Sequence, residues 1–179
     1  MIIRPAQMSD APAYLTHMKK HMRESGGEGR PIFHPIEDFE SWKLPELVEK
    51  VSEAWAKPVT EAGWERKWLL DDSGLILGDA HLRGPKIATA LHRCELGLGI
   101  QESARGLGHG SDLIDTMLSW AQTQDSIFWI DLHVFAHNKR AIELYESFGF
   151  QTYGMTMDLY RVHGHSIDDV HMSLQIREE

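Results

Sequence analysis

The chain has 179 residues, of which 42% are hydrophobic and 25% are charged, as is ordinary for a globular protein. We expect residues 1–179 to form a single domain, because this length supports one sizeable core. The net charge of −9 argues against a nucleic-acid partner, since phosphate binding needs concentrated Lys and Arg.

The sequence contains neither an apolar run of about 18 residues nor the apolar core of a signal peptide. It therefore predicts a soluble, cytoplasmic protein with no membrane partner. A single cysteine, Cys94, permits no internal disulfide and fits a reducing compartment. Its leucine-rich surroundings indicate a small packed side chain more than a nucleophile.

Residues 2–6 predict a first strand, and Ser9 or Asp10 is placed to cap the helix that follows. The buried side of this helix is predicted to consist of Tyr14, Leu15, Met18 and Met22. His17 and His21 are four residues apart, as metal ligands can be, but no third ligand with motif spacing accompanies them. We therefore expect both histidines to face solvent.

The next part of the chain predicts a loop, two helices and a hairpin. Residues 25–35, SGGEGRPIFHP, contain three glycines and two prolines and indicate the loop. Helical segments are expected at 36–42 and 45–56, the second with an apolar stripe toward the core. Strands at 66–70 and 75–82 flank an Asp-Asp-Ser-Gly turn, which is typical of a hairpin.

A strand beginning near Leu91 runs into a glycine-rich turn at residues 105–110, RGLGHG, and an amphipathic helix follows. Such a turn presents unpaired backbone N–H groups at a helix N-terminus, where they favour a phosphate. A P-loop needs GxxxxGK[ST], which is absent from the sequence. The dinucleotide motif GxGxxG fails because Ser111 occupies its third glycine position.

A second motif follows the strand at 127–135, which is apolar on both sides and predicts a central strand covered on both faces. The motif is NKRAIELYESFGF at 138–150, and Asn138 occupies the N-cap position of its helix. Strands at 150–160 and 170–176 close the sheet, and no linker or repeat divides the chain. The order of elements indicates an α/β sandwich.

With Arg-x-x-Gly-x-Gly in the turn and then Asn, Ala, Leu-Tyr and Gly-Phe in the second motif, the sequence resembles the GNAT superfamily of acyl-CoA-dependent N-acyltransferases. The resemblance is strong at 95–150, looser toward the C-terminus and weak before residue 64. It implies a GNAT-type α/β fold, with a mixed, mostly antiparallel central sheet flanked by helices on both faces. It also implies acetyl-CoA as the acyl-donor cosubstrate and no metal.

By this resemblance, the turn holds the coenzyme A pyrophosphate mainly through backbone amides, and the preceding strand offers backbone groups to the pantetheine arm. The side chain of His109 is left either exposed or near a phosphate. The implied coenzyme-binding residues are Leu98, Gly99, Ile100, Arg105, Gly106, Leu107, Gly108, His109, Gly110, Ser111, Asn138, Ala141 and Tyr145.

Acyl transfer from a thioester to an amine needs a neutral amine, a polarised carbonyl and a proton for the leaving thiolate. The resemblance implies that Tyr145 points at the coenzyme sulfur and acts as the general acid; the alternative is a tyrosine that only packs in its helix. Glu95 shares a strand face with Gly97 and Gly99, so a cleft can form above the glycines.

In that cleft, the Glu95 carboxylate could accept the ammonium proton, directly or through water, and the open alternative is a structural ion pair or a cation-binding carboxylate. His133 and His171, both on predicted strands, are further candidates for the base. Spacing favours neither histidine.

In GNAT proteins the region between the first two strands lines the acceptor site. Acidic residues there, which could receive a cationic amine or simply form a solvated face, are Glu28, Glu37, Asp38 and Glu40. Residues 154–174 look like the subgroup of ribosomal-protein N-terminal acetyltransferases and polyamine acetyltransferases.

The predicted function is an N-acetyltransferase acting on the primary amine of a small molecule, for example a polyamine, by direct attack in a ternary complex. The alternatives are a peptide N-terminus as acceptor, or a non-catalytic acyl-CoA-binding regulatory module. The sequence leaves a homodimer open.

Overall fold

The computed structural model describes residues 1–27 and 30–178. Its strands are β1 (Ile2–Pro5), β2 (Glu65–Asp72), β3 (Leu75–Arg83), β4 (Arg93–Ile100), β5 (Trp129–Phe135), β6 (Gln151–Val162) and β7 (His165–Gln175). Its α-helices are α1 (Ala11–Arg23), α2 (Leu44–Ala56), α3 (His109–Gln122) and α4 (Lys139–Ser147). In the described part of the chain, none of the helices has the length and apolar character needed to span a bilayer.

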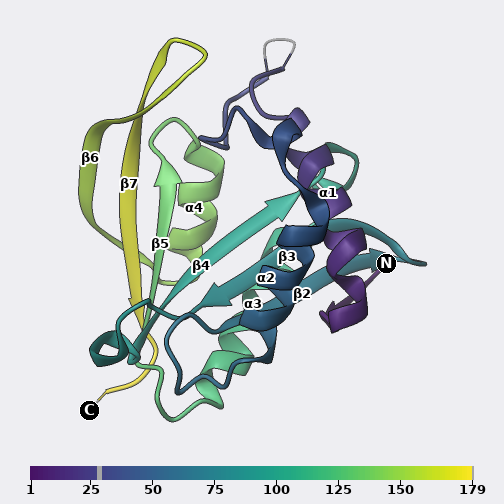
Figure 1. The fold of residues 1–179 in the computed structure, drawn as a ribbon. Coiled ribbons are helices and arrows are strands. Elements are labelled where there is room, and N and C mark those ends of the chain that lie inside the picture. Colours follow the sequence, from purple (N-terminus) through teal and green to yellow (C-terminus); the bar gives the residue numbers. More distant parts are fainter. Residues whose placement is uncertain (28–29, 179) are drawn as a thin grey trace.

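The seven strands of the described residues form one sheet in the order β1-β2-β3-β4-β5-β7-β6. Strands β4 and β5 run parallel, and the other neighbouring strands are antiparallel. Helices α1 and α2 pack on β3 and β2 from one side, and α3 contacts β2, β3 and β4 from behind (Figure 1). The predicted mixed, mostly antiparallel sheet with helices on both faces is confirmed.

Two tight turns fix the hairpins of the sheet. Ser73 and Gly74, between β2 and β3, have φ angles of 55° and 94°, and His163 and Gly164, between β6 and β7, have φ angles of 49° and 79°. Positive φ at both central residues defines a type I′ turn, whose twist matches that of the flanking strands. The hairpin expected around the Asp-Asp-Ser-Gly turn is confirmed.

The parallel pair β4–β5 separates partway along its length. Pairing runs from Arg93 with Trp129 to Leu96 with Leu132 and then ends, although β4 continues to Ile100 and β5 to Phe135. The arrowheads of the two strands point apart in Figure 1. Since the turns leading to α3 and α4 follow these strands, both motifs lie at the opening of this V.

The prediction that His17 and His21 face solvent is wrong, because their residues are only 3% and 7% exposed beneath α1. His17 Nε2 lies 3.0 Å from an oxygen of Asp79 on β3, and Gln101 Nε2 donates to His17 Nδ1 at 2.8 Å. The His21 ring stacks parallel to that of His17, and their centroids are 5.9 Å apart. Partners supplied by β3 and the end of β4 satisfy a polar helix face that the sequence presents as solvated.

Two further expectations are wrong in detail. Only Phe39–Ser41 forms a 3₁₀ turn in the segment predicted to be helical at 36–42, because Glu37 is engaged by the backbone N–H of His163 in the β6–β7 turn. Strand β5 is central but is not covered on both faces, since Asp131 is half-buried and His133 is exposed. Helices α1 and α2 contact β3 and β2, and this leaves the same face of β5 open.

Candidate active site

The V between β4 and β5 opens into a cleft of about 1170 Å³. Its walls are the end of β4, the glycine-rich turn, the start of α4 and the loop that follows α1. The predicted coenzyme-binding residues line this cleft except Leu107, whose residue is 61% exposed. The fold therefore brings together two motifs that are separated by about thirty residues in the sequence.

The glycine-rich turn has the geometry of an anion cradle. Gly106 and Gly108 have φ angles of 80° and 88°, a conformation that glycine adopts without steric cost, and Gly108 is the N-cap of α3. The amides of residues 106–108 donate no backbone hydrogen bond within the described chain. Together with the unpaired N–H groups of the first helical turn, they suit a phosphate.

Arg105 links the glycine-rich turn to the ends of α1 and β4. Its guanidinium donates to Glu24 Oε2 at the end of α1 and to the Ile100 carbonyl, both at 2.8 Å. It also lies over the Phe33 ring, 4.9 Å from the centroid. Its contacts are therefore structural, and its positive charge remains beside the cradle.

His109, at the first position of α3, offers a further group to an anion. Its Nε2 atom is buried and has no hydrogen-bond partner among the described residues, and the residue lines the cleft. A buried nitrogen without a partner is costly unless a ligand satisfies it. This observation favours the placement near a phosphate over the exposed one.

The second motif contributes a helix cap and a buried phenol. Asn138 Oδ1 accepts the Ala141 N–H at 3.3 Å, which confirms the predicted N-cap. Tyr145 is 6% exposed and packs edge-on against Phe150, with ring centroids 5.9 Å apart. Burial raises the pKa of Tyr145 to about 12, so its hydroxyl stays protonated at neutral pH. That hydroxyl has no hydrogen-bond partner in the described chain, and the residue lines the cleft.

A family model described as the acetyltransferase (GNAT) family matches residues 36–150. The chain belongs to this family. GNAT proteins use acetyl-CoA as the acetyl donor. The unpaired amides of residues 106–108 are donors of the kind that a phosphate accepts. No sequence among the curated proteins compared with the chain matched it.

Solved structures show the same GNAT fold at low sequence identity. An acetyltransferase of the GNAT family from Streptococcus pneumoniae has a TM-score of 0.83 at 21% identity, over 97% of this chain and 98% of that one. The Salmonella typhimurium protein yncA, solved with its cofactor acetyl-CoA, gives 0.81 at 17%, over 100% and 95%. A spermidine N-acetyltransferase variant from Vibrio cholerae gives 0.70 at 21%, over 98% and 95%.

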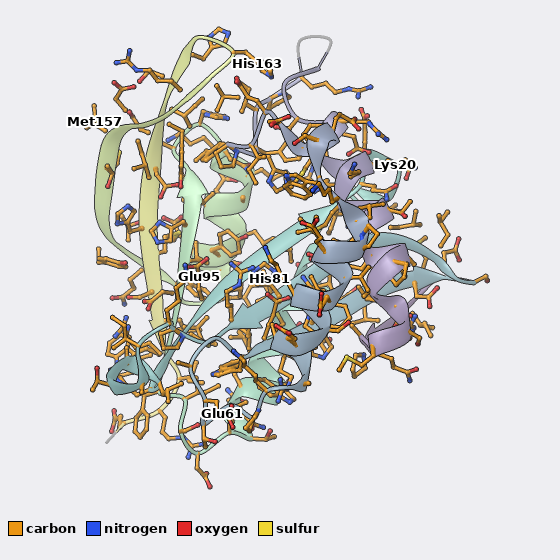
Figure 2. The ribbon with its side chains drawn as sticks, viewed as in Figure 1. Lys20, Glu61, His81, Glu95, Met157 and His163 are labelled. Atoms are coloured by element: carbon orange, nitrogen blue, oxygen red, sulfur yellow. The ribbon has the colours of Figure 1, made fainter. Side chains whose placement is uncertain are left out.

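Glu95 lies at the start of the V in this GNAT fold. Its register partners are Arg83 on β3 and Asp131 on β5, and Figure 2 shows it near His81. The residue is exposed and lines the cleft. Within the described residues its carboxylate makes no hydrogen bond or ion pair, so the structural ion pair considered as an alternative is not formed.

The space directly above Gly97 and Gly99 is not empty, contrary to expectation. A Cβ on Gly97 would lie 2.3 Å from the His81 ring, and one on Gly99 would lie 2.8 Å from the His21 ring. Burial and the charge of nearby His34 lower the pKa of His21 to about 3, and burial and Lys67 lower that of His81. The glycines thus admit two histidines that stay neutral and line the cleft.

A buried charged cluster supports this floor. Lys67 Nζ lies 3.0 Å from Asp79 Oδ2 and 3.5 Å from Glu65 Oε1, and it sits 4.1 Å from the Tyr14 ring centroid. Burial is the largest single influence and would lower the pKa of Lys67, but Asp79, Tyr14 and Glu65 together outweigh it and raise that pKa. Burial opposes ionisation of Asp79 as well, and Lys67 nevertheless holds its pKa well below the usual range.

The described acids among those predicted to bind the acceptor do not line the cleft. Glu40 pairs with Arg23 at 2.6 Å on the surface, Glu37 contacts His163, and Asp38 is exposed. Glu28 lies outside the described residues. The loop instead turns Ile32, Phe33, His34 and their neighbours toward the cleft. These positions weaken the prediction that the loop acids bind the acceptor.

The part of the cleft formed by β5 and β7 carries a hydrogen-bonded histidine. His133 Nδ1 lies 2.7 Å from Asp169 Oδ2, and both residues line the cleft. His171 Nε2 is 3.5 Å from the same oxygen and 3.1 Å from Thr156 Oγ1. The sequence identified both histidines but not Asp169, because only the pairing of β5 with β7 brings them together. The ligand atoms of the three residues lie within 4.8 Å of one another.

Proposed function

We propose that this GNAT protein is an N-acetyltransferase that moves an acetyl group from acetyl-CoA to the primary amine of a small molecule, for example a polyamine. The observation that carries the proposal is the single cleft, which joins an anion cradle, a protonated buried phenol and a polar wall with acidic groups. The likeness to a spermidine N-acetyltransferase supports the acceptor class.

Acetyl-CoA supplies an activated acetyl thioester. The residues of the chain position the two substrates and transfer protons. The cradle at residues 106–110 holds the pyrophosphate, and the Tyr145 hydroxyl donates a proton to the leaving thiolate. Glu95 and Asp169, which line the same cleft as the cradle, favour a cationic amine. Holding both substrates in one cleft lowers the barrier by several kcal/mol, up to roughly 7 to 11. A covalent enzyme intermediate is therefore unnecessary.

The experiment is thiol release from acetyl-CoA in the presence of polyamines, amino acids, aminoglycosides or peptides with free N-termini. We expect release with at least one small amine. Release with peptides alone would favour the N-terminal protein acetyltransferase, which the sequence left open. Coenzyme binding without release for any amine would favour the regulatory module.

The cradle is tested by Gly108→Asp, with Gly108→Asn as its matched control. A Cβ at this position meets nothing within 4 Å, and Asp and Asn both tolerate the positive φ, so the two variants differ mainly in charge. We expect calorimetry to show coenzyme A affinity at least about 10-fold weaker for the Asp variant than for the Asn variant. Equal affinities in folded proteins would refute the phosphate assignment.

A further inference from the structure

A second histidine system, separate from the neutral histidines on the cleft floor, lies on the paired strands β5 and β7. His133 follows Leu132, the last β5 residue paired with β4, so it lies at the apex of the V. Its side chain is 44% exposed, whereas that of Asp169 is only 2% exposed. The dyad therefore presents an accessible ring held from behind by a buried carboxylate.

The contact fixes the tautomer of His133. An ionised carboxylate can only accept hydrogen bonds, so Nδ1 must carry the proton in the 2.7 Å contact with Asp169 Oδ2. The neutral ring then has its lone pair on Nε2, and no hydrogen bond occupies that atom within the described residues. A histidine oriented by a carboxylate, with its other nitrogen free, is the arrangement that enzymes use for proton transfer.

We propose that His133 is the general base that takes the proton from the acceptor amine, and that Asp169 is the positioning residue that orients it and stabilises its charged form. This assignment rests on the proposed function and replaces Glu95 in that role. The Glu95 carboxylate lies in the same cleft, but no partner fixes its direction.

The proposed step balances in protons and electrons. The amine nitrogen forms a bond to the acetyl carbon, and the carbon–sulfur bond breaks with its electron pair on sulfur. The amine proton passes to His133 Nε2, and the thiolate takes a proton from the Tyr145 hydroxyl. Bulk water then removes the proton from His133 and restores Tyr145, so the net products are the acetylated amine and free coenzyme A.

His171 completes the dyad from the other side of Asp169. Its ring centroid is 4.6 Å from that of His133, and its Nε2 approaches both Asp169 and Thr156. These contacts limit the rotation of the carboxylate. The same donors resemble those of a zinc site, so metal dependence is an outcome that the test must separate.

The test compares His133→Ala, Asp169→Asn and Glu95→Gln, with His92→Ala as a control at an exposed histidine outside the cleft. We expect His133→Ala to lower kcat by roughly 10²- to 10⁴-fold with unchanged coenzyme A affinity, and added imidazole to restore part of the rate. His92→Ala should change kcat less than about 3-fold, and Glu95→Gln should lower kcat less than His133→Ala does. Asp169→Asn should lower kcat alone but add nothing to His133→Ala, because it acts through His133.

A measurement that does not depend on turnover reports the tautomer of His133 directly. The ¹⁵N shifts of His133 should report a proton on Nδ1 in the wild type and a mixture of tautomers in Asp169→Asn, provided that circular dichroism shows the variant folded. If that variant unfolds, the tautomer of His133 in the wild type is the test. A proton on Nε2 of wild-type His133 would refute the proposal.

Other results would refute the proposed roles of His133 and Asp169, and each result would do so in a distinguishable way. Wild-type turnover in His133→Ala, or a larger loss in Glu95→Gln, would remove His133 while leaving the proposed function intact. Activity lost to EDTA and restored by Zn²⁺ alone would replace the base with a metal site. A wild-type protein that binds coenzyme A but acetylates no amine would overturn the proposed function and the dyad together.

Discussion

The buried charges around Lys67 allow a sharp test of what stabilises the cleft floor. Lys67→Met removes the cation that faces Asp79 and Glu65, and Asp79→Asn removes the closer acid while keeping its shape. At 3.0 Å and an effective dielectric constant of 20, the Lys67–Asp79 attraction is about 5 kcal/mol before desolvation is subtracted. Breaking one partner of a buried pair typically costs about 3 to 5 kcal/mol.

The structure predicts different losses of stability for the two single variants. In Asp79→Asn, Lys67 keeps Glu65 at 3.5 Å, so we expect a loss of about 3 kcal/mol in the free energy of unfolding. In Lys67→Met, two carboxylates lose their shared cation, although Glu65 retains Arg83 at 3.1 Å, so we expect about 5 kcal/mol. The double variant removes both charges and should lose at least about 2 kcal/mol less than the sum of the singles.

Urea unfolding followed by tryptophan fluorescence measures these free energies. The matched control is Lys43→Met with Glu46→Gln, an exposed pair at 3.2 Å that should contribute less than about 1 kcal/mol. The wild type should also lose stability as the pH falls below about 4, because the depressed pKa of Asp79 stabilises the fold only while the carboxylate is ionised. Asp79→Asn should flatten that acid limb. Additive losses in the double variant would refute the ion pair as the main interaction.

Two further predictions concern the cleft. Tyr145→Phe should lower kcat by roughly 10- to 10⁴-fold and change stability by about 1 kcal/mol or less, since the hydroxyl has no partner in the described residues; wild-type kcat with chemistry rate-limiting would exclude the acid role. Gly97→Ala should destabilise the protein by about 1 to 3 kcal/mol, because its Cβ would lie 2.3 Å from the His81 ring. Adding His81→Ala should recover most of that loss in urea unfolding, and no recovery would contradict the packing argument.

Features that depend only on neighbouring residues in the chain could be predicted from the sequence. The hairpin at the Asp-Asp-Ser-Gly turn and the Asn138 cap depend on local backbone geometry, and the structure places both as expected. The histidines could not be predicted in the same way. The burial of His17 depends on Asp79, about sixty residues away, and the orientation of His133 depends on Asp169.

The polar face of the sheet explains how one surface serves both stability and chemistry. Where α1 covers the face, its charges are paired and dry, as with Lys67 and Asp79. Where the helices end, the same face continues across β4 and β5 as Glu95 and His133, which remain exposed. A charge under the helix must be neutralised within the protein, whereas a group beside it can exchange protons with a substrate. We therefore expect substitutions under α1 to act first on unfolding, and those at His133 to act first on kcat.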